Sequence, residues 1–383
     1  MKKKFLSILI ASTIIVSQAP ILQTSAITLE KSTSTYENGV NLQKDMMVDG
    51  SYQGEDGALV DNIKTFKTVE AAINAIPTEN TKNVVIFIKN GTYKEKLKIS
   101  KPNVTLVGES SEGAVITFDD ASRTIKRTED GGDGTLTYGT SNSASVTVTE
   151  AASNFAAVNL TIANEFDEEA NVSMKNKQAI ALKNESNKSM LVNCRLLGNQ
   201  DTLYANKNNQ YYYGCYIEGD VDFIFGGANA VFDNCEIKSI DRVGIDPKGY
   251  VAAPSTLEEN KGFLIQNSKL TSNIEEKESI YLGRPWHPSS AKTPVNSTVI
   301  YKNCEMGAHI KTEGWTEMSC AGVMIQPLDN RMYEYGSTGE GSRTSDTRRV
   351  LTDEQASQYT IENILSGWDV SQKKAELELY KKM

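Results

Sequence analysis

Two aspartates, Asp201 and Asp222, are the side chains whose type and spacing most favour chemistry. Asp222 is followed by an apolar run, so an ionised carboxylate there needs a nearby cation. Gln178 precedes Asp201 by a spacing (201 − 178) close to that between the two aspartates (222 − 201), and Gln200 adjoins Asp201. An isolated aspartate is more often a turn residue or a solvated charge. The spacing of this pair, with two amide donors beside it, instead favours a site in which carboxylates move protons.

Other routes to hydrolysis have little support in the sequence. The chain has 2 histidines, His287 and His309, and neither has a partner at the spacing of helical zinc ligands. The Gly-x-Ser-x-Gly turn of serine hydrolases is absent, and residues 108–113 only approximate it. We therefore expect neither a serine triad nor a metal site, and no cofactor.

The spacing of the two aspartates also belongs to a repeat in the middle of the chain. Each unit has Asn or Gly, then a small or apolar residue, a variable residue and a long apolar residue. The units begin at Asn103, Asn159, Asn193, Gly214, Asn234, Asn267 and Asn303. The two central intervals (214 − 193 and 234 − 214) match the spacing of the aspartates to within one position, and the longer intervals around them indicate inserted loops. The gap from 103 to 159 is long enough for two units.

A period of about 20 residues with alternating apolar and polar positions is typical of a solenoid of short strands. The sequence therefore predicts an all-β fold, a right-handed parallel β-helix whose coils stack ~4.8 Å apart. One coil would bring Asp201 and Asp222 to neighbouring strands, with their carboxyl groups roughly 5 Å apart. Small residues such as Cys194, Cys215 and Cys235 would stack inside the coil. A β-sandwich is the alternative, but its hairpins recur at shorter intervals.

Short capping helices are expected at the N- and C-terminal ends of the solenoid, because an uncovered coil exposes its strand edges. Residues 68–76 have an amphipathic helical pattern, and a buried strand is predicted over residues 84–88. A second helix is predicted over residues 352–365, with acidic residues at its start. Residues 372–383 are expected to form a solvated helix or a frayed tail.

The first 26 residues have the order of a secretory signal peptide. Lysines at positions 2–4 precede an apolar run over residues 5–16, and small residues at 24–26 suit cleavage. The run is too short to span a bilayer, and a buried N-terminal helix is the alternative. We therefore expect a secreted, extracellular protein with a leader over residues 1–26, a single domain over residues 27–383 and no membrane partner.

The net charge argues against nucleic acid as a partner. The formal charge of −9 becomes −12 once the three lysines of the leader are removed (−9 − 3 = −12), whereas binding to nucleic acid depends on clustered basic residues. An anionic polymer remains compatible with this charge, but its recognition must then be local. Nothing in the sequence requires more than a monomer.

Five motifs in this order resemble those of the pectin methylesterases, the bacterial branch of the pectinesterase family, over about residues 64–368. They are Gly91–Glu95, Gln178–Leu182, Gly198–Tyr204, Asp222–Gly226 and Leu282–Trp286. The resemblance implies that the partner is pectin, that is, methylated polygalacturonate. It implies that the reaction is hydrolysis of the methyl esters, with release of methanol.

The resemblance also implies a role for each polar residue of the candidate site. Asp222 would be the nucleophile that forms an acyl-enzyme, and Asp201 would be the proton donor and acceptor. Gln178 and Gln200 would donate to the oxyanion, a contribution of ~3 kcal/mol per donor. Arg284 would pair with Asp222 and keep it ionised beside Asp201, although a surface salt bridge is the alternative for an arginine considered alone.

Further contacts follow from the same resemblance. The implied substrate-binding residues are Thr140, Tyr204, Phe225, Arg242, Trp286 and Ser289. The aromatic members would stack on sugar rings, and Arg242 would suit a free galacturonate, although the sequence around Arg242 departs from the family pattern and Ser289 stands where relatives often carry threonine. Cys215 and Cys235 match a pair that forms a disulfide in some relatives, and free stacked thiols are the alternative.

Three other functions compete with ester hydrolysis. A retaining glycosidase also uses two carboxylates ~5 Å apart, but it has no acyl oxyanion for the two glutamines to stabilise. A thioesterase-like relative on the same fold would hydrolyse an acyl thioester and ignore pectin. A β-helix without catalytic activity would bind cell-wall polysaccharide and show no turnover.

Overall fold

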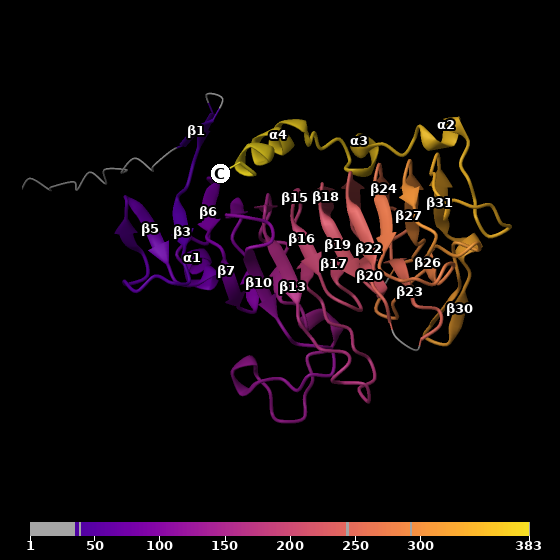
Figure 1. Cartoon of the computed structure of the whole chain (residues 1–383), viewed down its shortest axis with the longest axis horizontal. Helices are drawn as coiled ribbons and strands as arrows, with labels where there is room; N and C mark the ends of the chain where they lie inside the picture. Colours follow the sequence, from indigo (N-terminus) through magenta and orange to yellow (C-terminus); the bar gives the residue numbers. More distant parts are fainter. Residues whose placement is uncertain (1–34, 38–39, 243–244, 292, 383) are drawn as a thin grey trace, which may run out of the picture. The chain divides into compact units, whose positions relative to one another are not determined.

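The computed structural model describes residues 35–37, 40–242, 245–291 and 293–382, and the expected leader over residues 1–26 lies outside them. The described strands form a parallel β-helix, which confirms the predicted fold class (Figure 1). Within these residues, no helix has the length and apolar character that crossing a membrane requires.

Each complete coil contributes one strand to each of three sheets, and the ends of the solenoid add strands to only some of them. The eight-stranded sheet contains β7 (Gly91–Lys94), β10 (Ala114–Phe118), β13 (Thr161–Asn164), β16 (Arg195–Leu197), β19 (Tyr216–Gly219), β22 (Glu236–Ser239), β25 (Lys269–Ser272) and β28 (Glu305–Met306). The seven-stranded sheet contains β8 (Leu97–Ile99), β11 (Val146–Val148), β14 (Leu182–Asn184), β17 (Leu203–Ala205), β20 (Val221–Gly226), β23 (Gly249–Pro254) and β26 (Ile280–Gly283).

The third sheet is the longest of the three. Its twelve strands are β3 (Met46–Val48), β4 (Ala58–Val60), β5 (Ile63–Phe66), β6 (Val84–Ile88), β9 (Val104–Gly108), β12 (Ala156–Val158), β15 (Ser189–Val192), β18 (Asn209–Tyr213), β21 (Asn229–Asp233), β24 (Phe263–Gln266), β27 (Thr298–Lys302) and β31 (Arg331–Tyr335). Strand β6 has the predicted bounds. Two antiparallel pairs lie outside these sheets: β1 (Thr35–Glu37) with β2 (Val40–Leu42), and β29 (Met318–Cys320) with β30 (Val323–Ile325).

The repeated asparagine marks one left-handed residue in each coil. At the seven repeat positions φ lies between +51° and +60°, and the unit that departs from asparagine carries Gly214. Asparagine and glycine are the residues that adopt this conformation at the lowest cost. The side chains also form part of the expected ladder, since the Asn193 amide donates to Asn159 Oδ1 at 2.9 Å. The repeated asparagine is thus explained by the left-handed backbone that each coil needs at this position.

The residues that follow the repeated asparagine point into the core. Cys194, Cys215, Cys235 and Cys304 are all buried there, as the predicted stack requires. Cys215 and Cys235 are free thiols in the structure. Of the two alternatives for this pair, a disulfide or free stacked thiols, the structure therefore has the free thiols.

The prediction of two coils between residues 103 and 159 is wrong. Strand β9 pairs directly with β12, and β10 pairs directly with β13, so this stretch is a single coil. The extra length is a loop between β10 and β11 that contains the short 3-10 helices η1 (Thr128–Asp130) and η2 (Thr140–Asn142). Its polar, glycine-containing sequence lacks the alternation that a further strand needs. The loop reaches the candidate site described below.

The helices follow the sequence in part. Helix α1 (Val69–Asn74) begins after Thr68, whose hydroxyl accepts a hydrogen bond from the Ala71 amide at 3.1 Å. The predicted helix over 352–365 is instead two short helices, α2 (Asp353–Ala356) and α3 (Ile361–Ile364). Thr360 divides them, because its hydroxyl accepts from the Asn363 amide at 3.1 Å and starts a new helix.

The C-terminal helices cover the outer face of the twelve-stranded sheet (Figure 1). Helix α3 contacts β21 and β24, and helix α4 (Ser371–Tyr380) contacts β12 and β15. Leu377 and Tyr380 of α4 are buried in this contact. The C-terminal segment is therefore a packed helix, and not the predicted solvated helix or frayed tail. It covers the face of the twelve-stranded sheet more than it covers the last coil. A further 3-10 helix, η3 (Pro327–Asp329), precedes β31.

Candidate active site

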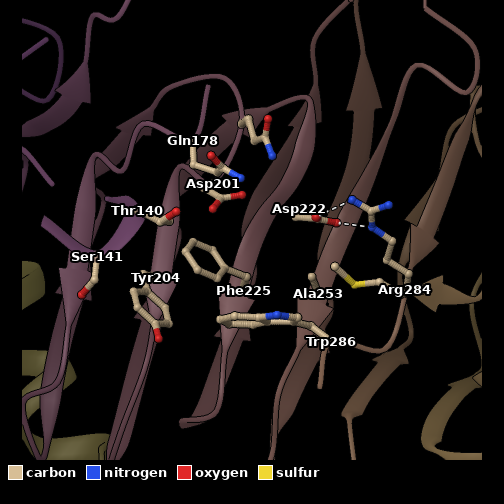
Figure 2. A pocket seen from close by; sticks show the side chains of 12 residues that line it. Thr140, Ser141, Gln178, Asp201, Tyr204, Asp222, Phe225, Ala253, Arg284 and Trp286 are labelled. Atoms are coloured by element: carbon tan, nitrogen blue, oxygen red, sulfur yellow. Dashed lines mark hydrogen bonds and ion pairs between the residues drawn. The ribbon is translucent and has the colours of Figure 1, made fainter. Parts of the chain in front are cut away.

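A pocket of about 280 Å³ opens on the outer face of the seven-stranded sheet (Figure 2). It collects side chains from three neighbouring strands and from loops on either side of them. The lining residues are Thr140, Ser141, Gln178, Gln200, Asp201, Tyr204, Asp222, Phe225, Ala253, Arg284, Trp286 and Met318. The pocket thus brings together nine of the eleven residues that the sequence proposed for catalysis and substrate binding.

The coil places Asp201 and Asp222 on adjacent strands. Strands β17 and β20 pair with Leu203 opposite Ile224, so their register offset (224 − 203) equals the spacing of the two aspartates (222 − 201). The Asp201 amide donates to the Val221 carbonyl at 3.0 Å, one residue before Asp222. Both aspartates have left-handed backbones, with φ of +69° and +52°. This conformation, together with the irregular pairing of β20 with β23 between Val221 and Ile224, turns two acidic side chains out of an otherwise buried strand region.

Arg284 forms a two-pronged ion pair with Asp222 (Figure 2). Its Nε donates to Oδ1 at 2.9 Å and its Nη2 donates to Oδ2 at 2.6 Å. The guanidinium carbon lies 3.8 Å from the ring centroid of Tyr250. Burial lowers the pKa of Arg284, but the charge of Asp222 outweighs it and leaves that pKa above its ordinary value. Asp222 therefore has a permanent cation bound to both oxygens of its side chain.

Asp201 is in the opposite electrostatic situation. Its side chain is buried, and burial raises the pKa of this carboxyl well above the usual range. The charge of Asp222 raises it further, Arg284 opposes the rise, and Asp220 and Glu168 add to it. Asp201 is thus the member of the pair whose carboxyl more readily keeps a proton.

Gln178 and Gln200 lie on the two coils that precede Asp222. The Ala179 amide donates to the Gln200 carbonyl at 3.1 Å, and the Ser122 amide donates to the Gln178 carbonyl at 2.7 Å, which fixes both backbones. The Oε1 atom of Gln178 is buried and has no hydrogen-bond partner among the described atoms. Figure 2 shows the Gln178 side chain next to Asp201, at the edge of the pocket.

Three aromatic rings form the wall opposite the glutamines (Figure 2). Tyr204 and Phe225 are paired across β17 and β20, and their rings stack at 4.3 Å with an interplanar angle of 6°. Trp286, which follows β26, tilts against Phe225 at 5.7 Å. Apolar ring faces beside a polar corner suit a saccharide, whose rings have apolar faces and hydroxyl edges.

Two proposed substrate contacts lie outside this lining. Arg242 has its Nε 3.7 Å from Asp220 Oδ2 and 3.9 Å from Glu168 Oε2, so its charge faces two carboxylates of the protein itself. Ser289 is exposed, and its neighbours Pro288 and Ser290 line a different, larger pocket. Arg242 and Ser289 lie in loops, outside the repeat, so the repeat spacing does not predict where their side chains lie.

Several residues of the site were not predicted from the sequence. Met318 and Ala253 line the pocket, and Tyr250 lies under the Arg284 guanidinium. Tyr250 lies opposite Val221, but their separation (250 − 221) departs from the repeat spacing, so the repeat did not reveal it. The repeat did not reveal Met318 either, because it comes from the β29–β30 hairpin outside the repeat.

The histidines take no part in this site. His287 Nε2 lies 3.0 Å from Asn330 Oδ1, and burial lowers the pKa of His309 to about 4. Across the described ranges, no group of three or more His, Cys, Asp or Glu side chains is arranged to hold a metal ion.

Comparison with known proteins gives consistent matches. The Pectinesterase family model matches residues 58–368. Pectinesterase A of Dickeya chrysanthemi is 37% identical over 333 residues, which cover 80% of this chain and 88% of that protein.

Solved structures give the same result. A pectin methylesterase in complex with a hexasaccharide matches with a TM-score of 0.76 and 35% identity, over 86% of this chain and 98% of that chain. The pectin methylesterase from Yersinia enterocolitica matches with a TM-score of 0.73 and 36% identity, over 80% of this chain and 100% of that chain.

Proposed function

Because this chain belongs to the pectinesterase family and is a carboxylic ester hydrolase that removes methyl esters from pectin, we propose that Asp222 is the nucleophile of the reaction. The observation that carries the proposal is the difference between the two buried aspartates. Arg284 makes two hydrogen bonds to Asp222, whereas the pKa of Asp201 is raised by burial and by its acidic neighbours. One carboxylate is thus suited to attack and the other to carry a proton.

The first half of the reaction releases methanol. An Asp222 carboxylate oxygen attacks the ester carbonyl carbon of a galacturonate unit, and the carbonyl electrons move onto its oxygen. When the carbonyl forms again, the bond to the methoxy oxygen breaks, and Asp201 gives its proton to the leaving methoxide. The products are methanol, an acyl-enzyme on Asp222 and an ionised Asp201.

Gln178 and Gln200 stabilise the charge that develops on the carbonyl oxygen. Both line the pocket beside Asp201, and side-chain amide N–H groups are donors that need no proton transfer. Such donors contribute most when they point to the oxygen of the transition state, where each is worth ~3 kcal/mol.

The second half of the reaction restores the enzyme. The ionised Asp201 takes a proton from water, and the resulting hydroxide attacks the acyl carbon. The bond to Asp222 breaks, which returns Asp222 to its carboxylate form and Asp201 to its protonated form. The galacturonate unit leaves as a free acid.

The substrate chain lies across the pocket. Thr140, Tyr204, Phe225 and Trp286 contact the sugar unit at the reacting ester, a role that their place in the pocket lining supports. Arg242 and Ser289 lie outside this lining and contact units farther along the chain. A related pectin methylesterase with a bound hexasaccharide supports an extended substrate of this kind.

We also propose that the protein is exported and acts as a monomer. Pectinesterases are typically extracellular enzymes. The basic, apolar and small residues of the first 26 positions have the order of a cleavable leader, which leaves residues 27–383 as one mature domain.

Methylated pectin tests the reaction against its nearest competitor. Methanol and new reducing ends are measured in the same digest. An esterase releases methanol without new reducing ends, whereas a glycosidase at the same carboxylate pair produces reducing ends without methanol. A thioesterase or a protein that only binds polysaccharide would release neither.

A further inference from the structure

A second pocket of about 580 Å³ adjoins the candidate active site on the same sheet, and Ser141 lines both. Its lining consists of Lys96, Leu97, Lys98, Lys126, Asp130, Tyr138, Ser141, Asn142, Ala144, Thr147, Thr149, Lys183 and Glu185. We propose that this basic pocket binds the carboxylates of demethylated galacturonate units, the product of the adjacent site. The proposal rests on the function proposed above, because it takes its ligand from that reaction.

The strand register places the basic pocket in line with the aromatic wall. Lys98 lies opposite Thr147, Thr147 opposite Lys183, Lys183 opposite Tyr204 and Tyr204 opposite Phe225. The residues on either side of the first four along their strands are buried, so this row faces outward. Neighbouring strands are ~4.8 Å apart, so Lys183 lies one strand from Tyr204 and Lys98 lies three. One extended polymer can therefore lie over the aromatic rings and the lysines together.

The charge of the basic pocket differs from that of the whole chain. Four lysines and two acids line it, a balance of +2 (4 − 2), in a chain of formal charge −9. Lys183 pairs with Glu185 at 3.1 Å, and Lys96 pairs with Asp120. Lys98 and Lys126 have no ion-pair partner in the described part of the chain. Two ammonium groups are thus available for anions.

The neutral residues of the basic pocket suit a sugar. Hydroxyl groups of Thr147 and Ser141 and the amide of Asn142 lie among the lysines, where they can pair with sugar hydroxyls. A small anion would need the charges alone, whereas a uronic acid polymer uses both kinds of group. The occupant that fits both is an acidic polysaccharide.

The reaction supplies this ligand and sets its position. Hydrolysis converts a neutral methyl ester into a carboxylate, so the chain gains negative charge one unit at a time. A methylated stretch matches the aromatic wall, and a demethylated stretch matches Lys98 and Lys126. The basic pocket would therefore retain the product end of the chain while the next ester reaches Asp222.

The test measures binding of a fully demethylated oligogalacturonate by calorimetry at low ionic strength. In the variant pair Lys98→Gln with Lys126→Gln we expect the Kd to rise about tenfold or more, because two unscreened charges are lost. The pair Lys98→Arg with Lys126→Arg keeps the charge and should bind within about twofold of the wild type.

Lys82 and Lys261 provide a matched control. Both are exposed, neither has an ion-pair partner among the described residues, and both lie in turns that enter the twelve-stranded sheet. Lys82→Gln with Lys261→Gln removes the same charge and should leave the Kd unchanged. If both Gln pairs weaken binding equally, or if Lys98→Gln with Lys126→Gln leaves it unchanged, the basic pocket is not the site.

Methanol release by the wild type is measured separately on methylated pectin. If the wild type releases methanol but Lys98 and Lys126 have no role in binding, only this inference is overturned. Absence of release would overturn the proposed function instead, whatever the affinity for the demethylated polymer.

Discussion

Arg284 holds both carboxylate oxygens of Asp222, from Nε to Oδ1 at 2.9 Å and from Nη2 to Oδ2 at 2.6 Å. Its neighbour Asp201 lies one coil away and has no ion pair among the described residues. The same solenoid register that stacks the two acids therefore also separates them electrostatically. One acid lies against a fixed cation, and the pKa of the other is raised by burial and by the charge of its neighbour.

Replacement of this arginine by lysine tests the pairing geometry. In Arg284→Lys the positive charge remains, but an ammonium group cannot make two parallel hydrogen bonds to one carboxylate. We expect kcat for methanol release to fall by about 10²-fold and KM to change little, since the loss concerns the orientation of Asp222. Full activity in Arg284→Lys would mean that charge alone is sufficient. Arg195→Lys, an arginine of the eight-stranded sheet that pairs with Glu112 outside the pocket, is the control.

The two glutamines are tested by removal of one amide at a time. Gln178→Ala should lower kcat about 10²- to 10³-fold with a nearly unchanged KM, because an oxyanion donor acts in the transition state. Gln200→Ala should behave in the same way. Steady-state methanol release gives both constants, and a rise in KM at constant kcat would show that the amides only bind the substrate.

The acid cluster behind Asp201 predicts a shift in the pH profile. Burial raises the pKa of Asp220 to about 7, with Glu168 adding to the rise and Arg242 opposing it. Above that pH the charge of Asp220 helps to keep Asp201 protonated, since it raises the pKa of Asp201. Asp220→Asn removes that charge, so the pKa of Asp201 falls and the alkaline limb of kcat should move to lower pH. An unchanged limb would separate Asp220 from the proton carrier.

Asp220 also predicts a change in stability with pH. Its folded pKa of about 7 lies above its unfolded value of 3.8, so its contribution to stability is full below the unfolded value and is lost as the pH rises through 7. Asp220→Asn lacks this loss. The melting temperature of the wild type should therefore decline more steeply than that of the variant between about pH 4 and pH 8, and parallel curves would contradict the assigned shift.

The repeated asparagine predicts a stability difference between two variants at one position. Asn193 has φ of +52° and donates to Asn159. Asn193→Gly and Asn193→Ala both lose this hydrogen bond, but only alanine meets the cost of a left-handed backbone. We expect the alanine variant to be less stable than the glycine variant by about 1 kcal/mol in denaturant unfolding. Equal stabilities would argue against a backbone origin of the repeat.

The repeat made the fold and the meeting of the two aspartates with Gln178 and Gln200 predictable from the sequence, whereas the other predicted pocket residues came from the family resemblance. Its regular period gives the coil, and the coil gives the register that brings Asp201 to Asp222. The same period could not show that residues 119–145 form one inserted loop, because a polar stretch fits a loop as well as an irregular coil. Ser141, which this loop brings to the pocket, was missed for the same reason, whereas Thr140 of the same loop was predicted through the family resemblance.

Contacts between charged residues of different loops were the other feature that could not be predicted from the sequence. The guanidinium of Arg242 faces Asp220, between β19 and β20, and Glu168, in the loop after β13, and no spacing in the sequence connects the three. The division of the predicted helix over 352–365 depended on a single hydroxyl, that of Thr360, which competes with the helix it interrupts. Regular stacking can be read from a sequence, whereas contacts between loops cannot.

The most direct test of Asp222 as the nucleophile is the turnover number of Asp222→Asn for methanol release, with Asp220→Asn as the control. Asp220 is also buried and lies two residues earlier, so its variant reports the effect of losing a buried carboxylate close to the site. The account predicts a loss of about 10⁴-fold or more in Asp222→Asn, with binding of methylated oligogalacturonate retained, and a far smaller loss in Asp220→Asn. A turnover number for Asp222→Asn within about tenfold of the wild type would contradict it.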